Sequence, residues 1–493
     1  MAQFILAGLV ALSCLRGLVR WRDGLFGIVL IAAVQDPLRK LVPGVPGYLA
    51  LAVVPALAVA LMALMGTQRF WKSGFARRYP TVGRAMGWFG LACIPAALTS
   101  AFYGPGSWML TILGAFSYGV LLEAIFLGFH FSRSIKDLRR FVGFYCVVTT
   151  VMLSGAAIQY FELWPGSLAV GTEALGTSWI RHMPGVQIQM ISGFYRSPDV
   201  MGWHAATTAM FAAILSLTTR GTSRRIWLVL GAIAVVALLL CGRRKMVYML
   251  PVFGSILIML YWKARASGRA AGLLVGLAVV GIVLTEGFEV GQGSDVGRYY
   301  TAGSVDVLDR LNSNGFNSLL VTFDQTGFFG SGLGVATPGS QHLNVARPRA
   351  WQEGAASRIL VELGVPGLLA FGVLVMTMLV AGWRVTIRQL RARAPTSGYA
   401  AGFFAFFLAN VGSLVVSGQI LADAAIATLI GLAIGFVLSL DGVSVPRVEP
   451  GAWSRAASAR FARADARIDV GRPRAPSPYA DARRRIPGGL TRH

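Results

Sequence analysis

The chain has little charge for its length. Asp, Glu, Lys and Arg make up 13% of its 493 residues, whereas 55% of the residues are hydrophobic. A soluble protein is about one quarter charged, and a disordered chain is polar and poor in apolar residues. The low charge therefore excludes an ordinary soluble protein and disorder over most of the chain. Apolar runs of bilayer-spanning length recur along the sequence, which predicts one integral-membrane bundle.

Cysteine is also scarce. The four cysteines, Cys14, Cys93, Cys146 and Cys241, lie in or next to apolar runs, with neither CxxC spacing nor the spacing of metal ligands. This pattern argues against a disulfide framework and against a zinc site. The first residues lack the positively charged segment of a cleavable signal peptide, so we interpret them as the first membrane helix.

Acidic residues are few: 21 Asp and Glu stand against 45 Lys and Arg, for a net charge of +24. In a soluble protein this excess would suggest a nucleic-acid partner. Here the basic residues concentrate in every second short loop, which is the pattern of the positive-inside rule. We therefore expect no nucleic-acid partner, basic loops and a C-terminus on the cytoplasmic side, and contact with membrane lipids.

The apolar runs predict an all-α polytopic membrane protein with about 12–13 transmembrane helices in residues 1–440. The predicted helices lie near 2–16, 23–35, 46–65, 83–101, 106–130, 141–160, 199–218, 225–241, 246–262, 270–286, 357–382, 397–417 and 420–440. Two long connections, 161–198 and 287–356, fall on the non-cytoplasmic side, and the second is far longer than an ordinary helix connection. Residues 441–493, rich in Arg, Ala and Pro, are interpreted as a disordered basic cytoplasmic tail.

The sequence CysGlyArgArgLys at 241–245 joins two apolar runs on the non-cytoplasmic side and breaks the positive-inside pattern. Cations placed near a membrane interior usually serve a function. Arginine offers several donors in one plane, which suits a phosphate group. Arg243 and Arg244 are therefore candidate ligands of a lipid-linked diphosphate. The alternative is that they extend toward lipid headgroups.

The segment from Gly193 to His204 opens the seventh predicted helix. Arg196 is a second candidate for a phosphate-binding cation, with a packed arginine as the equal alternative. For the other two polar residues the structural interpretation is preferred: Asp199 caps the helix start, with Pro198 just before it, and His204 is a packed histidine.

A glycine-rich turn at 327–335 resembles a phosphate loop only superficially, because no Lys-Ser/Thr follows it. Farther on, Arg358 and Glu362 are spaced to pair on one helix face. Glu353 lies about one turn before Arg358 and is the candidate general base for a sugar hydroxyl. Its alternative role is an acid that favours the helix dipole. His342 is the second candidate base.

In this order and on this topology, the GRR segment, the RSPDVMG segment, the GSGLG loop and the E…R…ELGVPG run resemble a known superfamily. It comprises the O-antigen ligases and the O-antigen or exopolysaccharide polymerases, which are glycosyltransferases of the bacterial inner membrane. The resemblance covers roughly residues 20–440. It implies transfer of a glycan from an undecaprenyl-diphosphate carrier at the periplasmic face, with no metal or other cofactor.

The resemblance also assigns roles. Arg243 and Arg244 match the family's diphosphate-binding arginines, and Arg196 is a weaker match; Arg358 is a further candidate. Ligases commonly carry a His-Asn pair before the last long helix, whereas this chain has Glu353 and Gly354 there, with His342 displaced upstream. This departure favours a polymerase with Glu353 as base. The expected partners are the lipid-linked glycan and, from the same pathway, a flippase and a chain-length regulator.

Direct displacement at the anomeric carbon, with the leaving diphosphate stabilised by arginines, inverts the configuration of the sugar. Three alternatives remain open at this point. A ligase would use lipid A–core as the acceptor. A polysaccharide or lipid transporter or flippase would be favoured by broken helices in matched halves. A non-catalytic membrane scaffold would leave the outer arginines unexplained.

Overall fold

The structure is a computed structural model. It describes residues 1–44, 46–67, 74–132, 134–163, 169–183, 186–264, 268, 272, 317–343, 345, 354–414 and 418–442. The chain divides into two compact units, Met1–Val443 and Ser444–His493. All described residues belong to the first unit, so the predicted basic tail lies outside them apart from its first two residues.

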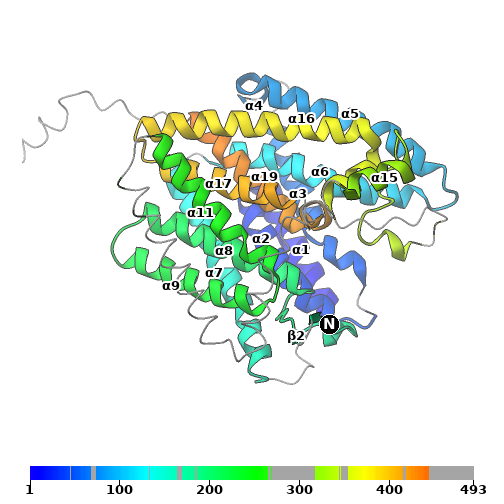
Figure 1. Cartoon of the computed structure of the whole chain (residues 1–493), viewed down its shortest axis with the longest axis horizontal. Coiled ribbons are helices and arrows are strands. Elements are labelled where there is room, and N and C mark those ends of the chain that lie inside the picture. Colours follow the sequence, from blue (N-terminus) through cyan, green and yellow to red (C-terminus); the bar gives the residue numbers. More distant parts are fainter. Residues whose placement is uncertain are drawn as a thin grey trace, which may run out of the picture. The chain divides into compact units, whose positions relative to one another are not determined.

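The described part of the chain is a helical bundle (Figure 1). Its helices are α1 (Ala2–Val19), α2 (Trp21–Lys40), α3 (Val53–Thr67), α4 (Gly74–Arg78), α5 (Pro80–Ala101), α6 (Trp108–Phe131), α7 (Ile135–Tyr160), α8 (Pro198–Thr218), α9 (Thr222–Leu240), α10 (Arg244–Val247), α11 (Met249–Lys263), α15 (Ser318–Thr326), α16 (Ala355–Arg391), α17 (Ser397–Leu414), α18 (Gln419–Ala422) and α19 (Ala424–Ser439). Twelve of the thirteen predicted helices are present, and the one near 270–286 lies outside the described residues apart from Gly272.

Within the described residues, nine helices are long and apolar enough to cross a membrane. Helices α17 and α19 are apolar but shorter. The chain is therefore a multi-pass α-helical membrane protein. The prediction of an all-α polytopic fold is confirmed, with one local addition: residues 180–183 and 186–189 form two short antiparallel strands. Strand β1 (Ile180–Met183) pairs with β2 (Val186–Gln189), and Ile180 lies opposite Gln189.

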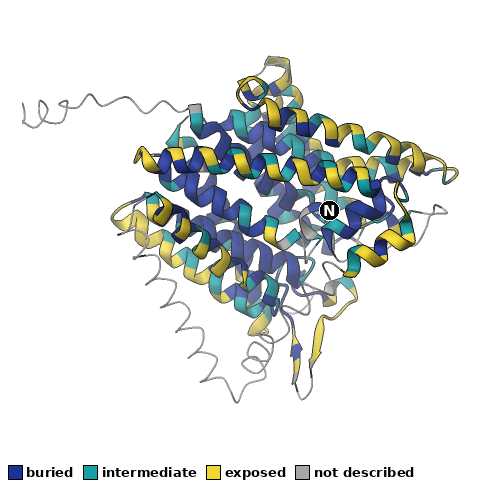
Figure 2. Cartoon of the chain, turned by 45° about the horizontal axis from the view of Figure 1, so that its top comes forward, coloured by how far each residue is buried: buried dark blue, intermediate teal, exposed yellow. Residues whose placement is uncertain are grey.

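Helix α8 lies at the centre of the bundle. In its most apolar window 83% of the residues are buried, against 17% in the neighbouring α9. Figure 2 shows the same contrast between a buried interior and peripheral helices whose outward faces are exposed. Because those exposed faces are apolar, they suit lipid, whereas most polar residues of α8 lie in the protein interior.

Helices α6 and α19 pack so closely that glycine is required between them. A Cβ atom added to Gly128 would lie 2.6 Å from the backbone oxygen of Leu432. Small residues that let helix backbones approach are typical of membrane bundles, where apolar burial alone gives no driving force between helices.

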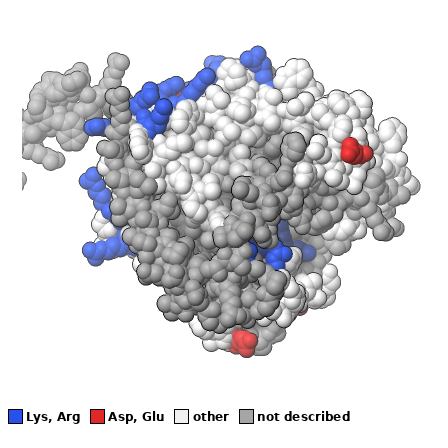
Figure 3. Space-filling view, viewed as in Figure 1, with Lys and Arg blue, Asp and Glu red and all other residues white. Residues whose placement is uncertain are grey.

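The basic loops gather at one end of the bundle, which we call the basic end. There Arg22, at the start of α2, donates to the backbone oxygens of His130 and Phe131 at the end of α6. Arg388, near the end of α16, pairs with Asp441. Figure 3 shows basic side chains along the left and upper edge of the view, over the ends of α11 and α16. The predicted alternation of basic loops is thus consistent with the way the helices are assembled.

Candidate functional site

The candidate site is built around the start of α8, at the end of the bundle opposite the basic end. Helix α8 has 21 residues, and at 1.5 Å per residue it is about 30 Å long, so its two ends lie near opposite membrane surfaces. Ser197 begins the helix: its hydroxyl accepts from the backbone N–H of Val200 at 3.3 Å, and Pro198 follows as the first helical residue. The prediction that Asp199 caps this helix is therefore wrong.

Arg196 joins three elements. Its Nη1 lies 3.4 Å from Oδ1 of Asp36 near the end of α2, and its Nη2 pairs with Oδ2 of Asp423, the residue before α19. The backbone N–H of Arg196 also donates to Asp36, at 3.1 Å. The two carboxylate side chains are only 2% and 4% exposed. Arg196 therefore ties the ends of α2 and α19 to the start of α8.

The charges around Arg196 shift its pKa in opposite directions. Burial lowers the pKa of the guanidinium, but the carboxylates of Asp423 and Asp36 raise it by more, so the pKa lies above its ordinary value. Arg196 is therefore permanently charged, and two buried carboxylates already surround it. The sequence placed Arg196 among the diphosphate ligands; the structure places it in an internal clamp, and its binding role stays a prediction.

Lys40, the last residue of α2, fixes the segment that leads into α8. Its ammonium donates to the backbone oxygens of Gly193 at 3.2 Å and of Tyr195 at 2.6 Å. Gln159 at the end of α7 holds the same segment by accepting from the N–H groups of Ser192 and Gly193. Burial lowers the pKa of Lys40 to about 8, although Asp36 and Glu173 partly oppose this shift.

A second ionic group lies on the other side of the α8 start. Asp199, in the first turn, accepts two cations: its Oδ2 lies 2.6 Å from Nη2 of Arg243, and its Oδ1 lies 2.8 Å from Nζ of Lys245. The guanidinium of Arg243 also covers the ring of Trp179, 4.9 Å from its centroid. Side-chain exposure is 13% for Arg243 and 34% for Lys245. We call Arg243, Lys245 and Asp199 the 243–245 cluster.

Arg244 begins the short helix α10 and is 8% exposed. The GRR segment therefore splits its two arginines. Arg243 belongs to the partly exposed 243–245 cluster, whereas Arg244 is buried. Its predicted role as a diphosphate ligand stays a prediction.

Arg358 and Glu362 form the predicted i,i+4 pair in the first part of α16. Nε of Arg358 lies 3.5 Å from Oε1 of Glu362, and the two side chains are 2% and 0% exposed. Arg358 also donates to the hydroxyls of Ser117, at 2.7 Å, and of Thr337, and Thr337 donates to Glu362 at 2.8 Å. The pairing prediction is confirmed. The contacts of Arg358 are internal, and its diphosphate-binding role stays a prediction.

The glycine-rich turn is a packing element rather than a phosphate loop. Helix α16 breaks at Gly364, whose φ is +68°. Two backbone bonds from the turn satisfy the groups freed by the break: Ser331 N–H donates to Val361 at 2.6 Å, and Val365 N–H donates to Phe328 at 2.9 Å. Gly334, at φ +86°, lies against the backbone of α6, where a Cβ would overlap the Leu110 oxygen.

The two predicted bases cannot be placed. Glu353 lies outside the described residues, and only the backbone of His342 is described, at the end of the short 3₁₀ turn Ser340–His342. The catalytic assignments of Glu353 and His342 therefore stay predictions.

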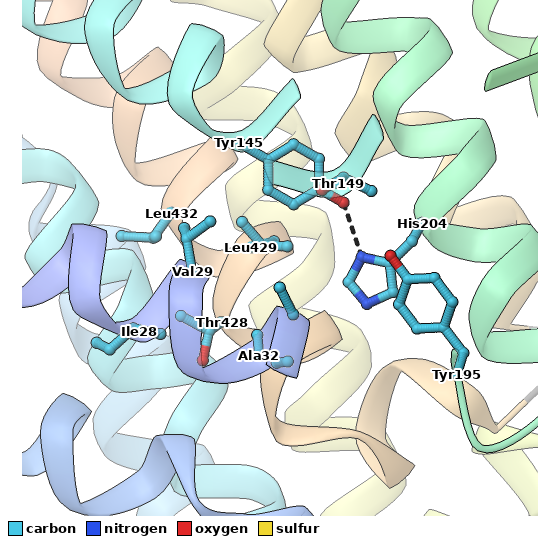
Figure 4. Close-up of a pocket in the computed structure, with 12 residues that line it drawn as sticks. Ile28, Val29, Ala32, Tyr145, Thr149, Tyr195, His204, Thr428, Leu429 and Leu432 are labelled. Carbon is cyan, nitrogen blue, oxygen red and sulfur yellow. Dashed lines mark hydrogen bonds between the residues drawn. The ribbon is translucent and has the colours of Figure 1, made fainter. Parts of the chain in front are cut away.

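His204 is packed inside the bundle, as the sequence reasoning preferred. Its Nδ1 lies 2.9 Å from the hydroxyl of Tyr145, and its ring stacks on Tyr195 with centroids 5.0 Å apart. These side chains line a cavity of about 10 Å³ between α2, α7, α8 and α19 (Figure 4). That volume is about enough for one water molecule. The cavity is a packing detail of the interior and is far too small for a sugar.

Sequence reasoning missed Asp36, Asp423 and Lys40. A signal for them was present: each is a charged residue at the end of an apolar run on the non-basic side, where charge is costly and is usually paired. Their partners could not be read from the sequence, because Arg196 is 160 residues from Asp36 and 227 from Asp423.

No protein-family model matches the chain, and a search of curated proteins finds no match.

Proposed function

We propose that this protein polymerises lipid-linked oligosaccharide repeat units, using undecaprenyl-diphosphate donors at the periplasmic face of the bacterial inner membrane. The product is a surface polysaccharide or exopolysaccharide. The observation that carries the proposal is the 243–245 cluster. It holds two cations against one carboxylate, partly exposed, beside the start of α8, which is the most buried of the nine long apolar helices among the described residues. The finer topology, with 12–13 spans and a cytoplasmic C-terminus, belongs to the same proposal.

The chemistry of the donor fits this placement. A lipid-linked diphosphate has its tail in the bilayer and its charge at the membrane surface, which is where a bundle end can meet it. Arg243 offers a planar set of donors and Lys245 a compact charge, and the start of α8 adds the positive end of a helix dipole. Cations that stabilise the departing diphosphate lower the barrier to glycosyl transfer, because negative charge develops there in the transition state.

The acceptor side of the reaction is assigned to Glu353, with His342 as the second candidate. A sugar hydroxyl needs one general base to lose its proton as it attacks. Direct attack on the anomeric carbon breaks its bond to the diphosphate oxygen, so one new glycosidic bond replaces one phosphate ester bond with inversion. The departing diphosphate keeps the electron pair, and the base takes the hydroxyl proton.

The broken helix α16 is the one observation that favours a transporter. Discontinuous helices often surround transported substrates, because their free backbone groups line a cavity. Here Ser331 and Phe328 of the glycine-rich turn satisfy those groups instead. The break therefore anchors a connecting segment, which supports an enzyme with a fixed outer segment more than a moving gate.

The test is a transfer assay with purified protein in nanodiscs and undecaprenyl-diphosphate oligosaccharide from the host. Wild type is compared with Arg243→Gln and Glu353→Gln, and with Arg181→Gln as a matched control, since Arg181 is an exposed cation on strand β1. A product ladder from wild type and Arg181→Gln, with both other variants inactive though folded, supports the polymerase.

Other outcomes contradict it in distinct ways. A single shifted product that requires lipid A–core identifies a ligase. No product with either acceptor, from folded protein and intact donor, rejects glycosyl transfer; leaflet movement of the same donor, independent of Glu353, then identifies a transporter.

A further inference from the structure

Asp199 is the centre of the 243–245 cluster, and both of its oxygens are occupied by cations. Oδ2 pairs with Arg243 at 2.6 Å and Oδ1 with Lys245 at 2.8 Å. The carboxylate is not needed to cap α8, because Ser197 does so. Two positive charges thus meet one negative charge, which leaves a single positive charge at the cluster.

We propose that Asp199 is a resident counter-ion that the diphosphate of the donor displaces. The inference rests on the proposed function and adds to it a residue that sets the strength of anion binding. In the empty protein Asp199 pairs with both Arg243 and Lys245 and offsets one of their two positive charges. When the donor arrives, its phosphate oxygens take over the two cations and the carboxylate is released.

The position of Asp199 allows this exchange. It lies in the first turn of α8, where a carboxylate is favoured by the helix dipole even without a cation. Its side chain is 10% exposed, and that of Lys245 is 34% exposed, so the pair is accessible from the surface of the bundle. Arg243 is held independently by the ring of Trp179, so the guanidinium stays in place when its carboxylate partner leaves.

Charge balance gives the exchange its selectivity. A phospholipid phosphate diester carries one negative charge, so its entry in place of Asp199 would gain no charge pairing. A diphosphate that is esterified at both ends carries two, which matches the two cations. The singly charged phosphates of membrane lipids therefore do not displace Asp199 from the two cations, whereas the doubly charged diphosphate donor does.

The experiment measures binding rather than transfer. The probe is a citronellyl diphosphate ester of a hexose, and the matched probe is the corresponding citronellyl monophosphate ester; each is titrated into purified full-length protein in detergent. The expected result for Asp199→Asn is diphosphate binding on the order of ten-fold tighter than in wild type. Monophosphate binding becomes measurable in the same variant. Glu173→Gln is the control, because Glu173 is an exposed acid outside the cluster; its effect is less than about two-fold.

A second pair of variants keeps the test decisive if Asp199→Asn does not fold. Arg243→Gln leaves Lys245 balanced by Asp199 and lowers diphosphate affinity. Adding Asp199→Asn to Arg243→Gln restores the single net positive charge of the wild-type cluster, and binding recovers toward the wild-type value. If Asp199 instead orients the cations for the ligand, the second substitution weakens binding further.

The outcomes separate the two proposals. Wild-type binding that depends on Arg243 but is unchanged or weakened by Asp199→Asn, without recovery in the double variant, overturns the counter-ion role and leaves the diphosphate site standing. Failure of every folded variant to bind the diphosphate probe overturns the site and the counter-ion together. An equal gain from Glu173→Gln also overturns the inference, because it shows only a general effect of surface charge.

Discussion

Both the start of α8 and the first part of α16 carry an arginine paired with a carboxylate: Arg243 with Asp199, and Arg358 with Glu362. The two arginines differ in their other contacts. Arg358 of α16 is 2% exposed and bonds to Glu362, Ser117 and Thr337. Arg243, beside α8, shares a single carboxylate with Lys245 and remains partly exposed. The α16 pair joins protein segments to one another, whereas the 243–245 cluster keeps one net positive charge, which the proposed diphosphate donor would use. Exposure and charge balance, rather than the presence of arginine, separate the two roles.

Arg196 shows that the same distinction applies within the α8 region. It pairs with two carboxylates, Asp36 and Asp423, and the cations Arg39 and Lys40 also interact with Asp36. Both Nη atoms of Arg196 are already paired with these carboxylates. Of the four arginines that the sequence grouped as candidate diphosphate ligands, Arg196 lies in an internal clamp, Arg358 in a buried pair and Arg243 in the 243–245 cluster. The fourth, Arg244, is buried at the start of α10.

The largest expected effect comes from removing the buried arginine. Arg358→Met leaves Glu362 buried without its cation and should lower the free energy of unfolding by about 3–5 kcal/mol. Arg243→Met should lower it by less than about 1 kcal/mol, because Asp199 keeps Lys245 and the site is partly exposed. Thermal unfolding in detergent measures both.

Addition of Glu362→Gln to Arg358→Met supplies the control, since it removes the uncompensated charge and should recover most of the lost stability. Equal losses from Arg358→Met and Arg243→Met would contradict the comparison between the two regions.

A smaller effect tests whether the glycine-rich turn packs against helices. Gly334→Ala places a Cβ onto the Leu110 carbonyl of α6 and should cost about 2–3 kcal/mol of stability beyond the backbone strain alone. Gly339→Ala is the matched control: Gly339 also has a positive φ, +99°, but its nearest atom would lie 3.9 Å away. If the two variants unfold at the same temperature, close packing of the turn is not what Gly334 provides.

Much of the fold was predictable because apolar length is a local property of the sequence. The runs that became α6 and α8 were located within two residues at each end, whereas α16 starts within two residues of the prediction but continues nine residues beyond the predicted end. The hairpin at 180–189 was not predicted, since its strands have four residues each, too few for a clear alternating pattern. The break at Gly364 was also missed, although Gly364 and Pro366 are residue types that commonly interrupt a helix.

The candidate site was predictable only where one segment carried the signal. Arg243 stood out because three cations on the non-basic side break the positive-inside pattern, and Arg358 with Glu362 followed from helical spacing. Asp199 was misassigned even though Ser197 and Pro198 together mark a helix start, because an acid in the first turn resembles a cap. The partners of Arg196 are Asp36 and Asp423. They could not be predicted, because the packing of α2 and α19 against the start of α8 cannot be inferred from a single sequence.

A pH effect of about 1 kcal/mol should come from Lys40. Its pKa is lowered from 10.5 to about 8 in the folded protein, so between these values the unfolded chain binds more protons than the folded one. The free energy of unfolding therefore rises with pH between about 8 and 10.5. Below pH 8 Lys40 is charged in both states, and the full cost of burying its charge destabilises the folded protein. Between pH 7 and pH 9 wild type should gain about 1 kcal/mol relative to Lys40→Gln.

The measurement is the difference in unfolding temperature between wild type and Lys40→Gln across that range, which cancels the titration of all other groups. A difference that does not change with pH would show that Lys40 is not titrating near 8. A difference that moves in the opposite direction would place its folded pKa above the ordinary value, as for a lysine dominated by Asp36 rather than by burial.

The smallest effect concerns the ring beneath Arg243. Trp179→Leu removes a cation–π contact whose centroid distance is 4.9 Å, and contacts of this kind at partly exposed sites contribute about 0.5–1 kcal/mol. Binding of the diphosphate probe should weaken by about two- to five-fold, and the free energy of unfolding should fall by no more than about 1 kcal/mol. Trp108→Leu, at the exposed start of α6, should leave binding unaltered. If Trp179→Leu binds as wild type does, then Asp199 alone orients the guanidinium, and the counter-ion could not leave without releasing Arg243 as well.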